Sequence, residues 1–189
     1  LRERADAAQG RLLLYQIGAR TLPHAIDLGL GIVKYGEEAR VALADFTLAG
    51  PQAKTLRHAE RRAVLEGASF AVLPPDEVAR HIAELGAVSD DWLRAKRQRE
   101  KAFSLGSFDP AYIARFPCAV VRIDGRIVAF ANILATPNRE EMSVDLMRHV
   151  ANLPYGVMDF LFLRLMDHAR AEGYRRFTLG IAPLAGIDG

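Results

Sequence analysis

Cysteine is almost absent from the sequence: Cys118 is the single one among 189 residues, so no disulfide can form within the chain. This usage is typical of proteins that fold in a reducing compartment, and we expect a cytoplasmic setting. Cys118 lies in the apolar segment FPCAVV. Because free cysteines in such segments are mostly buried, we interpret it as a structural thiol and not as a nucleophile.

An excess of one charge sign and long apolar runs are also lacking. The 25 Lys and Arg nearly balance the 23 Asp and Glu, which leaves a formal net charge of +2. A strongly polybasic protein is excluded, and an anionic partner would need a local basic patch. No segment reaches the roughly 18 apolar residues of a membrane span, and the N-terminal LRERADAAQG does not resemble a signal peptide. We therefore expect a soluble chain that is a piece of a longer protein.

The composition is that of an ordinary globular protein, with 50% hydrophobic and 25% charged residues. Such a chain can bury a core and suits one large domain or two small ones. The hydrophobic pattern predicts three elements in the first part of the chain, namely a buried strand at 11–18, a short helix at 21–30, and a strand at 31–43 that Gly36 interrupts.

From residue 54 the pattern predicts helices followed by an antiparallel run of strands. Asp124 and Gly125 give the clearest signal, a type I′ turn between apolar strands within 116–134. The other elements are a helix at 54–67, a strand at 68–73, a helix after Pro74 and Pro75, a helix capped by Ser89 or Asp90 with Trp92 as its anchor, a strand from 141, a helix at 154–173 and a strand at 174–184.

The strand that begins at residue 141 has the sequence EMSVDLMRHV. Regular alternation would put Met142, Val144 and Leu146 on one face, with Ser143, Asp145 and Met147 on the other. The strand ends in polar groups that can bind ions or move protons, and a very apolar helix follows it. These polar groups are the main candidates for a functional site.

The order of elements matches the GNAT-like acyltransferase fold. In that α/β (α+β) architecture helices flank a mixed, mostly antiparallel sheet, and a final β–α–β step places the last two strands side by side and parallel. Those two strands diverge, and the acyl donor and acceptor meet in the gap. The polar end of the strand at 141–150 is expected at this gap.

Seven segments, in order and together covering most of the chain, resemble the soluble C-terminal domain of the bacterial multiple peptide resistance factor, the phosphatidylglycerol lysyltransferase family. They are KYGEEARV, LRHAERRAVLEGASFAVLPP, SDDWLRAKRQREKAFSLGSFD, RFPCAVVRIDGRIVAFANIL, MSVDLMRH, GVMDFLFLRLMDHARAEGY and LGIAPLAG.

The resemblance implies two GNAT-like units in tandem, joined to an N-terminal multi-span membrane domain. Residues 1–53 would be the C-terminal part of the first unit, and residues 54–189 would be the second unit, truncated at its C-terminal end. The family domain continues beyond this point, so we expect part of the active site to be missing and the fragment to be inactive alone. The family works at the cytoplasmic face of the bacterial inner membrane.

The reaction implied is transfer of an aminoacyl group, lysyl or alanyl, from aminoacyl-tRNA to phosphatidylglycerol, which gives resistance to cationic antimicrobial peptides. The tRNA ester is already activated, so no metal and no cofactor are expected. The segment NLPYG before the helix at 154–173 also departs from the loop with which acetyltransferases bind coenzyme A. Gly156 alone matches that loop, and Pro154 removes a donor.

The resemblance places the catalytic residues in the DLMR segment. Asp145 would hold the ammonium of the aminoacyl group or help to deprotonate the lipid hydroxyl, and Arg148 would bind a phosphate. A structural ion pair between these two residues is the alternative. Weaker candidates for substrate binding are Asn132, Ser143, His149, whose imidazole could act as a base, and Tyr112.

A basic cluster could bind tRNA phosphates or lipid headgroups, or be a solvated helix face. Its members are Arg94, Lys96, Arg97, Arg99 and Lys101. Two other functions remain open. One is a GNAT-like aminoacyltransferase that acts on a peptide or small amine, and the other is a non-catalytic fragment that binds lipid or tRNA.

Overall fold

The computed structural model describes residues 1–100 and 106–187, which form two compact units. The smaller unit holds Leu1–Glu38 and the residues from Ile181 onward. Its helices are α1 (Arg2–Ala7), the 3-10 helix η1 (Ala19–Thr21) and α2 (Leu22–Asp27). The helix predicted at 21–30 is therefore confirmed at its centre.

The strand predicted at 11–18 is wrong, because this segment forms no strand. Gln16 adopts φ +54°, which interrupts an extended backbone, and Leu13 is 69% exposed. An apolar run forms a stable strand only where a neighbouring strand accepts its hydrogen bonds. The strand predicted at 31–43 begins only at Gly36, as β1 (Gly36–Ala42).

The larger unit, Ala39–Gly180, is built on a mixed sheet whose strand order is β1-β6-β5-β4-β3-β2. Strands β2 to β5 form an antiparallel meander, and β6 is parallel to β5. The bounds are β2 (Ser69–Leu73), β3 (Cys118–Ile123), β4 (Arg126–Ala135), β5 (Glu141–His149) and β6 (Arg176–Pro183). The predicted turn between β3 and β4 is confirmed, since Asp124 and Gly125 have φ values of +51° and +78°.

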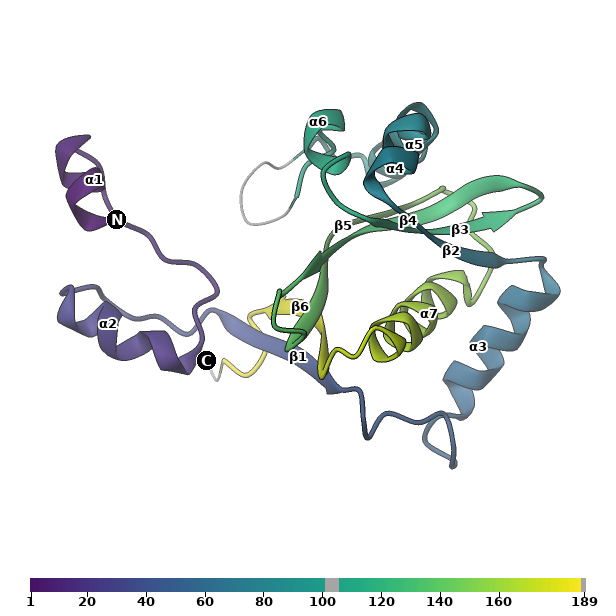
Figure 1. Cartoon of the computed structure of the whole chain (residues 1–189), viewed down its shortest axis with the longest axis horizontal. Helices are drawn as coiled ribbons and strands as arrows, with labels where there is room; N and C mark the ends of the chain where they lie inside the picture. Colours follow the sequence, from purple (N-terminus) through teal and green to yellow (C-terminus); the bar gives the residue numbers. More distant parts are fainter. Residues whose placement is uncertain (101–105, 188–189) are drawn as a thin grey trace. The chain divides into compact units, whose positions relative to one another are not determined.

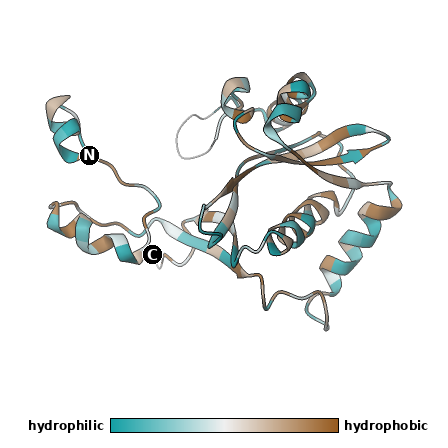
Figure 2. Ribbon diagram, in the orientation of Figure 1, coloured by the Kyte–Doolittle hydropathy of each residue, from teal (hydrophilic) through white to brown (hydrophobic). Residues whose placement is uncertain are grey.

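Helices cover both faces of this sheet (Figure 1). One face carries α3 (Lys54–Leu65) and α7 (Val157–Ala171), and the other carries α4 (Pro75–Arg80), α5 (Ile82–Lys96) and α6 (Pro110–Ile113). Each face has its own apolar layer, here called the α7 layer and the α5 layer. In Figure 2, α3 carries hydrophilic residues beside hydrophobic ones, as expected for a helix with one buried face.

The helix cap predicted at Ser89 or Asp90 is wrong. Helix α5 runs without interruption from Ile82 to Lys96, and the break lies earlier, at His81. Ser89 is buried in the middle of α5, between Leu85 and Trp92 in the helical repeat. This apolar stripe packs on the sheet, and burial of the stripe outweighs the local preference of serine for a cap.

The last two strands diverge as the fold class requires. Among the described residues, strands β5 and β6 pair over Glu141–Ser143 and Arg176–Thr178, and no pairing with β6 is present along the rest of β5. The meander, the α7 crossover and this separation establish the GNAT-like α/β fold that the element order predicts. None of the helices in the described part of the chain has the length and apolar character needed to cross a membrane.

The predicted alternation of β5 is correct only up to Val144. Met142 and Val144 contact the α7 layer, but Leu146 belongs to the α5 layer and Met147 returns to the α7 layer. The cause is a β-bulge: Ala131 pairs with Met147 and Ile133 with Val144, so one residue of β4 stands opposite two of β5. The bulge inverts the faces of every later residue in the strand.

Candidate functional site

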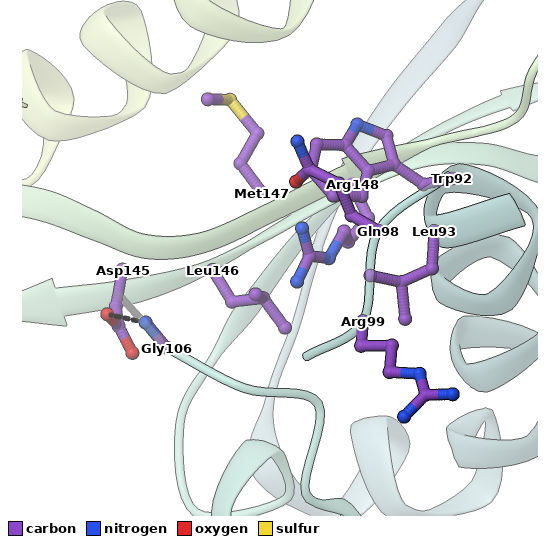
Figure 3. A pocket seen from close by; sticks show the side chains of 9 residues that line it. All are labelled: Trp92, Leu93, Gln98, Arg99, Gly106, Asp145, Leu146, Met147 and Arg148. Atoms are coloured by element: carbon purple, nitrogen blue, oxygen red, sulfur yellow. Dashed lines mark hydrogen bonds between the residues drawn. The ribbon is translucent and has the colours of Figure 1, made fainter. Parts of the chain in front are cut away.

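The polar end of β5 lines a pocket of about 190 Å³ on the α5 side of the sheet (Figure 3). Strand β5 supplies one wall, and the end of α5 with the segment after it supplies the other. Figure 3 shows Met147 leaving the strand on the side opposite to Leu146. The lining residues are Trp92, Leu93, Gln98, Arg99, Gly106, Asp145, Leu146, Met147 and Arg148.

The carboxylate of Asp145 is fixed by two donors. Its Oδ1 accepts a hydrogen bond from the backbone N–H of Gly106 at 3.0 Å, and its Oδ2 accepts one from the Tyr112 hydroxyl at 2.9 Å. A Cβ at position 106 would lie 2.4 Å from Oδ2 of Asp145. Only glycine leaves room for the carboxylate in this position.

Tyr112 acts as a hydrogen-bond donor at neutral pH. Burial raises the pKa of its hydroxyl, and the hydrogen bond to Asp145 and the negative charge of Asp145 raise it further. The protonated phenol can therefore hold Asp145 but cannot serve as a phenolate base. Helix α6 begins just before it, where the Asp109 side chain accepts a hydrogen bond from the Tyr112 N–H at 2.8 Å.

Arg148 is buried against an aromatic ring and paired with an acid. Its guanidinium carbon lies 4.0 Å from the centroid of the Trp92 ring, and its Nη2 donates to Glu100 Oε2 at 3.0 Å. Burial lowers the pKa of Arg148, whereas the charge of Glu100 and the hydrogen bond to it raise that pKa. An arginine remains charged at any physiological pH, so the pocket contains a fixed cation.

Asp145 and Arg148 do not form the ion pair considered as the alternative. Each has a different partner, Tyr112 for Asp145 and Glu100 for Arg148. The side chain of Arg148 is 9% exposed, and its Nε has no hydrogen-bond partner within the described ranges. The pocket thus presents an anion and a cation at separate points.

The other predicted substrate contacts lie outside the pocket lining. Asn132 is fully buried and accepts a hydrogen bond from the Leu146 N–H, Ser143 lies where β5 pairs with both neighbours, and His149 contacts the carbonyl of Val150 through Nδ1. Substrate contact by these three residues stays a prediction. Tyr112, ranked with them, is the one in direct contact with Asp145.

The predicted basic cluster is partly at the pocket. Arg99 lines it, whereas Arg94, Lys96 and Arg97 are exposed at the end of α5. Arg94 also lies 3.5 Å from Asp91. Lys101 lies outside the described residues.

Sequence reasoning missed Glu100 and Gly106 as parts of the site. Both lie between α5 and α6, outside the described helices and strands, where the sequence has no periodic pattern to interpret. Trp92 was identified as an anchor, but its contact with Arg148 was not. The fact that it is the single tryptophan in the chain was the available signal.

Cys118 is a buried structural thiol, as predicted. It is 0% exposed in the α5 layer, and burial raises the pKa of its thiol to about 12. A thiol with such a pKa is almost fully protonated at neutral pH and is a poor nucleophile.

The whole chain, residues 1–189, matches the family model described as phosphatidylglycerol lysyltransferase, C-terminal. The chain is 41% identical over 177 residues to a phosphatidylglycerol lysyltransferase of Bacillus subtilis (strain 168), a match that covers 93% of this chain and 20% of that protein. The chain thus spans about a fifth of the length of the curated relatives it matches, with 20% and 21% in two of them.

Two solved structures share the fold closely. The C-terminal domain of a candidate lysylphosphatidylglycerol synthetase from Agrobacterium fabrum is 45% identical, with a TM-score of 0.87 over 97% of this chain and 58% of that one. The structure of L-PGS from Bacillus licheniformis is 38% identical, with a TM-score of 0.88 over 98% of this chain and 59% of that one. The chain therefore belongs to the family of phosphatidylglycerol lysyltransferase C-terminal domains.

Proposed function

We propose that this chain forms part of a site that transfers a lysyl group from lysyl-tRNA to phosphatidylglycerol. The names of the relatives support the lysyl group and the lipid. The observation that carries the proposal is the placement of Asp145 and Arg148 in one pocket, on the part of β5 that has separated from β6. An anion and a cation held at separate points suit a cationic aminoacyl group and an anionic phosphate.

In this reaction the lipid hydroxyl oxygen attacks the ester carbonyl carbon. A new carbon–oxygen bond forms, the bond to the ribose oxygen of the tRNA breaks, and that oxygen takes up the proton given up by the lipid hydroxyl. Because the ester is already activated, the protein has to position the two substrates, assist the proton transfer and stabilise the oxyanion.

Asp145 would bind the ammonium of the aminoacyl group. Its two oxygens are held by Gly106 and Tyr112, and a carboxylate has further lone pairs free for a cation. The competing role is deprotonation of the lipid hydroxyl. Loss of ammonium binding raises KM for the aminoacyl-tRNA, whereas loss of a base lowers kcat and changes its dependence on pH.

Arg148 would bind a phosphate, either of the lipid or of the tRNA 3′ end. The guanidinium lies over the Trp92 ring, and its planar fork of donors suits the oxygens of a phosphate. Arg99 lines the same pocket, and the exposed Arg94, Lys96 and Arg97 extend this charge along the end of α5. Binding of either substrate should therefore weaken as salt is added.

Coenzyme A has no role in the proposed reaction. In acetyltransferases its pyrophosphate binds at the N-terminus of the helix that corresponds to α7. Here α3 approaches that end so closely that a Cβ at Gly156 would lie 2.2 Å from the carbonyl oxygen of Ala59. The neighbouring Tyr155 and His58 rings are in contact, with centroids 6.0 Å apart.

The site would work at the cytoplasmic face of the bacterial inner membrane. The curated relatives are about five times as long as this chain, which leaves room for the expected multi-span membrane domain. Lysine attached to the lipid would replace an anionic headgroup by a cationic one. This change is the expected basis of resistance to cationic antimicrobial peptides.

The test uses the full-length parent protein in membranes, with tRNA charged in turn with radiolabelled lysine and alanine. We expect lysine label in the phosphatidylglycerol fraction. Alanine label in that fraction would identify alanyl-tRNA as the donor. Label on a peptide or small amine would support the alternative acceptor. With no transfer, retained binding of lipid vesicles or tRNA would support the non-catalytic alternative.

Single variants test the assigned residues. Asp145→Asn and Arg148→Ala should each reduce transfer at least ~10-fold, which corresponds to about 1.4 kcal/mol. Asp27→Asn and Arg126→Ala, at exposed positions outside the pocket, are the matched controls. Wild-type rates in the first pair would remove both residues from the site.

A further inference from the structure

The β-bulge in β5 decides which side chains reach the pocket. A strand without a bulge alternates strictly, and Arg148 would then lie on the same face as Met142 and Val144. That face is the α7 layer, where the neighbouring side chains are apolar. With the bulge, Arg148 lies on the α5 side and stacks on Trp92.

The bulge leaves a backbone N–H that needs an acceptor. Asp145 and Leu146 together stand opposite Asn132, so the regular ladder between β4 and β5 is interrupted there. The Leu146 N–H donates instead to the side-chain oxygen Oδ1 of Asn132, at 2.6 Å. Since a backbone N–H can only donate, this contact fixes which end of the amide faces the bulge.

Asn132 is an unusual residue for its position. It is 0% exposed, and its pairing partner on β3 is Cys118, which belongs to the α5 layer. Its Nδ2 finds no acceptor within the described part of the chain. A buried amide that satisfies only one of its ends is less favourable than an apolar side chain of the same shape. The contact with Leu146 is the feature of this position that a leucine could not provide.

We propose that Asn132 is a positioning residue that holds the bulge and thereby turns Arg148 to the pocket side of the strand, the side on which Asp145 lies with or without the bulge. Asp145 is one of the two bulged residues, and Arg148 is the second residue after them. Asn132 lies outside the pocket lining, so it acts on the site through the backbone of β5. The role in catalysis rests on the proposed function, whereas the role in geometry does not.

The geometric part is tested in the 189-residue chain by the fluorescence of Trp92, its single tryptophan. Arg148→Leu gives the reference spectrum of an unstacked ring. Asn132→Leu, which keeps the volume but removes the acceptor, should give that same spectrum and quenching behaviour. Asn132→Asp, which keeps an acceptor oxygen, should resemble the wild type. A folded Asn132→Leu chain with the wild-type spectrum would overturn the proposal.

A measurement on the unmutated chain covers the case in which Asn132→Leu fails to fold. Nuclear magnetic resonance can detect the scalar coupling across a hydrogen bond, here between the Leu146 amide nitrogen and the Asn132 side-chain carbonyl carbon. We expect this coupling together with slow exchange of the Leu146 amide proton. Fast exchange of this amide proton without the coupling would refute the hydrogen bond between Leu146 and Asn132, and with it the proposal.

The catalytic part is tested in the full-length parent. Asn132→Leu should lower kcat for lysyl transfer at least ~10-fold, and Asn132→Asp should restore part of the loss. A wild-type kcat in a folded Asn132→Leu protein with an altered Trp92 spectrum would separate the bulge from catalysis. If the wild-type parent transfers nothing, the proposed function fails, and the spectra and coupling still decide the role of Asn132 in the fold.

Discussion

The guanidinium of Arg148 lies over the Trp92 ring, with its central carbon 4.0 Å from the ring centroid, which is within the range of a cation–π contact. The ring covers one side of the charge, and the Arg148 side chain is only 9% exposed. Lysine could not replace this arrangement, because an ammonium lacks the planar fork that both stacks and donates. The cation in the pocket is therefore specifically an arginine.

Replacing the ring should weaken the phosphate contact. Trp92→Leu removes a cation–π interaction of about 0.5–2 kcal/mol, and it frees the guanidinium to rotate. We expect a higher KM for the phosphate-bearing substrate with a smaller change in kcat, measured as lysyl transfer by the full-length parent. Trp92→Phe, which keeps an aromatic face, is the matched control. Equal KM values in Trp92→Leu and wild type would show that the ring does not orient Arg148 for binding.

Glu100 accepts a hydrogen bond from the Arg148 guanidinium that a phosphate would also use. One carboxylate oxygen accepts from the Arg148 Nη2, and the other accepts from the Phe108 N–H at 3.2 Å. A phosphate that binds Arg148 has to compete with this carboxylate. Glu100→Gln should therefore bind inorganic phosphate more tightly than the wild type, with Trp92 fluorescence as the signal.

The same substitution should destabilise the fold. A hydrogen bond to a charged group is worth about 1.5–3 kcal/mol, and Glu100→Gln weakens it by removing the negative charge. We expect a loss toward the low end of that range, because the Glu100 side chain is 31% exposed. Denaturant unfolding measures it. For the phosphate-binding prediction, Arg148→Leu is the non-binding control. An unchanged phosphate affinity in Glu100→Gln would mean that Glu100 does not compete with phosphate for Arg148.

The features that could be predicted from the sequence are those that depend on residues adjacent in the chain. Asp124 and Gly125 form the hairpin turn because a type I′ turn requires positive φ at both central residues, and this pair of residues adopts positive φ readily. The order of elements then gives the fold. The contact between Tyr112 and Asp145 was not predicted, since 33 positions separate them and the contact forms only where α6 and β5 meet in the folded chain.

The faces of β5 show where periodicity fails. Alternation assumes an unbroken ladder, whereas the bulge depends on a polar side chain of the neighbouring strand, Asn132 of β4. The cap predicted at Ser89 failed for a related reason, because packing of α5 on the sheet determined the helix boundary. In both cases a tertiary contact outweighed a correct local preference.

The Tyr112 hydroxyl should titrate above its ordinary value of about 10. Because the pKa is raised in the folded chain, the stabilisation from the neutral phenol is fully present below the unfolded pKa and is lost as the pH rises through the folded pKa. Phenolate absorbance, as the difference between wild type and Tyr112→Phe, reports the value directly. Asp145→Asn should reduce the shift without abolishing it, since burial is its largest cause. A Tyr112 pKa at or below 10 would contradict the contact.

Gly106→Ala tests the fixed position of Asp145 without touching its chemistry. The new methyl would lie 2.4 Å from Oδ2 and 3.0 Å from Oδ1 of Asp145, so the carboxylate has to move and the Tyr112 contact has to lengthen. We expect lysyl transfer to fall at least ~10-fold and the pKa of Tyr112 to approach its ordinary value. Gly18→Ala is the control, because a Cβ there meets no heavy atom within 4 Å. The substitution needs no change of fold, since Gly106 lies in a part-buried segment outside the helices and strands. If Gly106→Ala keeps both the wild-type rate and the raised pKa of Tyr112, the carboxylate tolerates displacement, and its two hydrogen bonds are not what makes the site work.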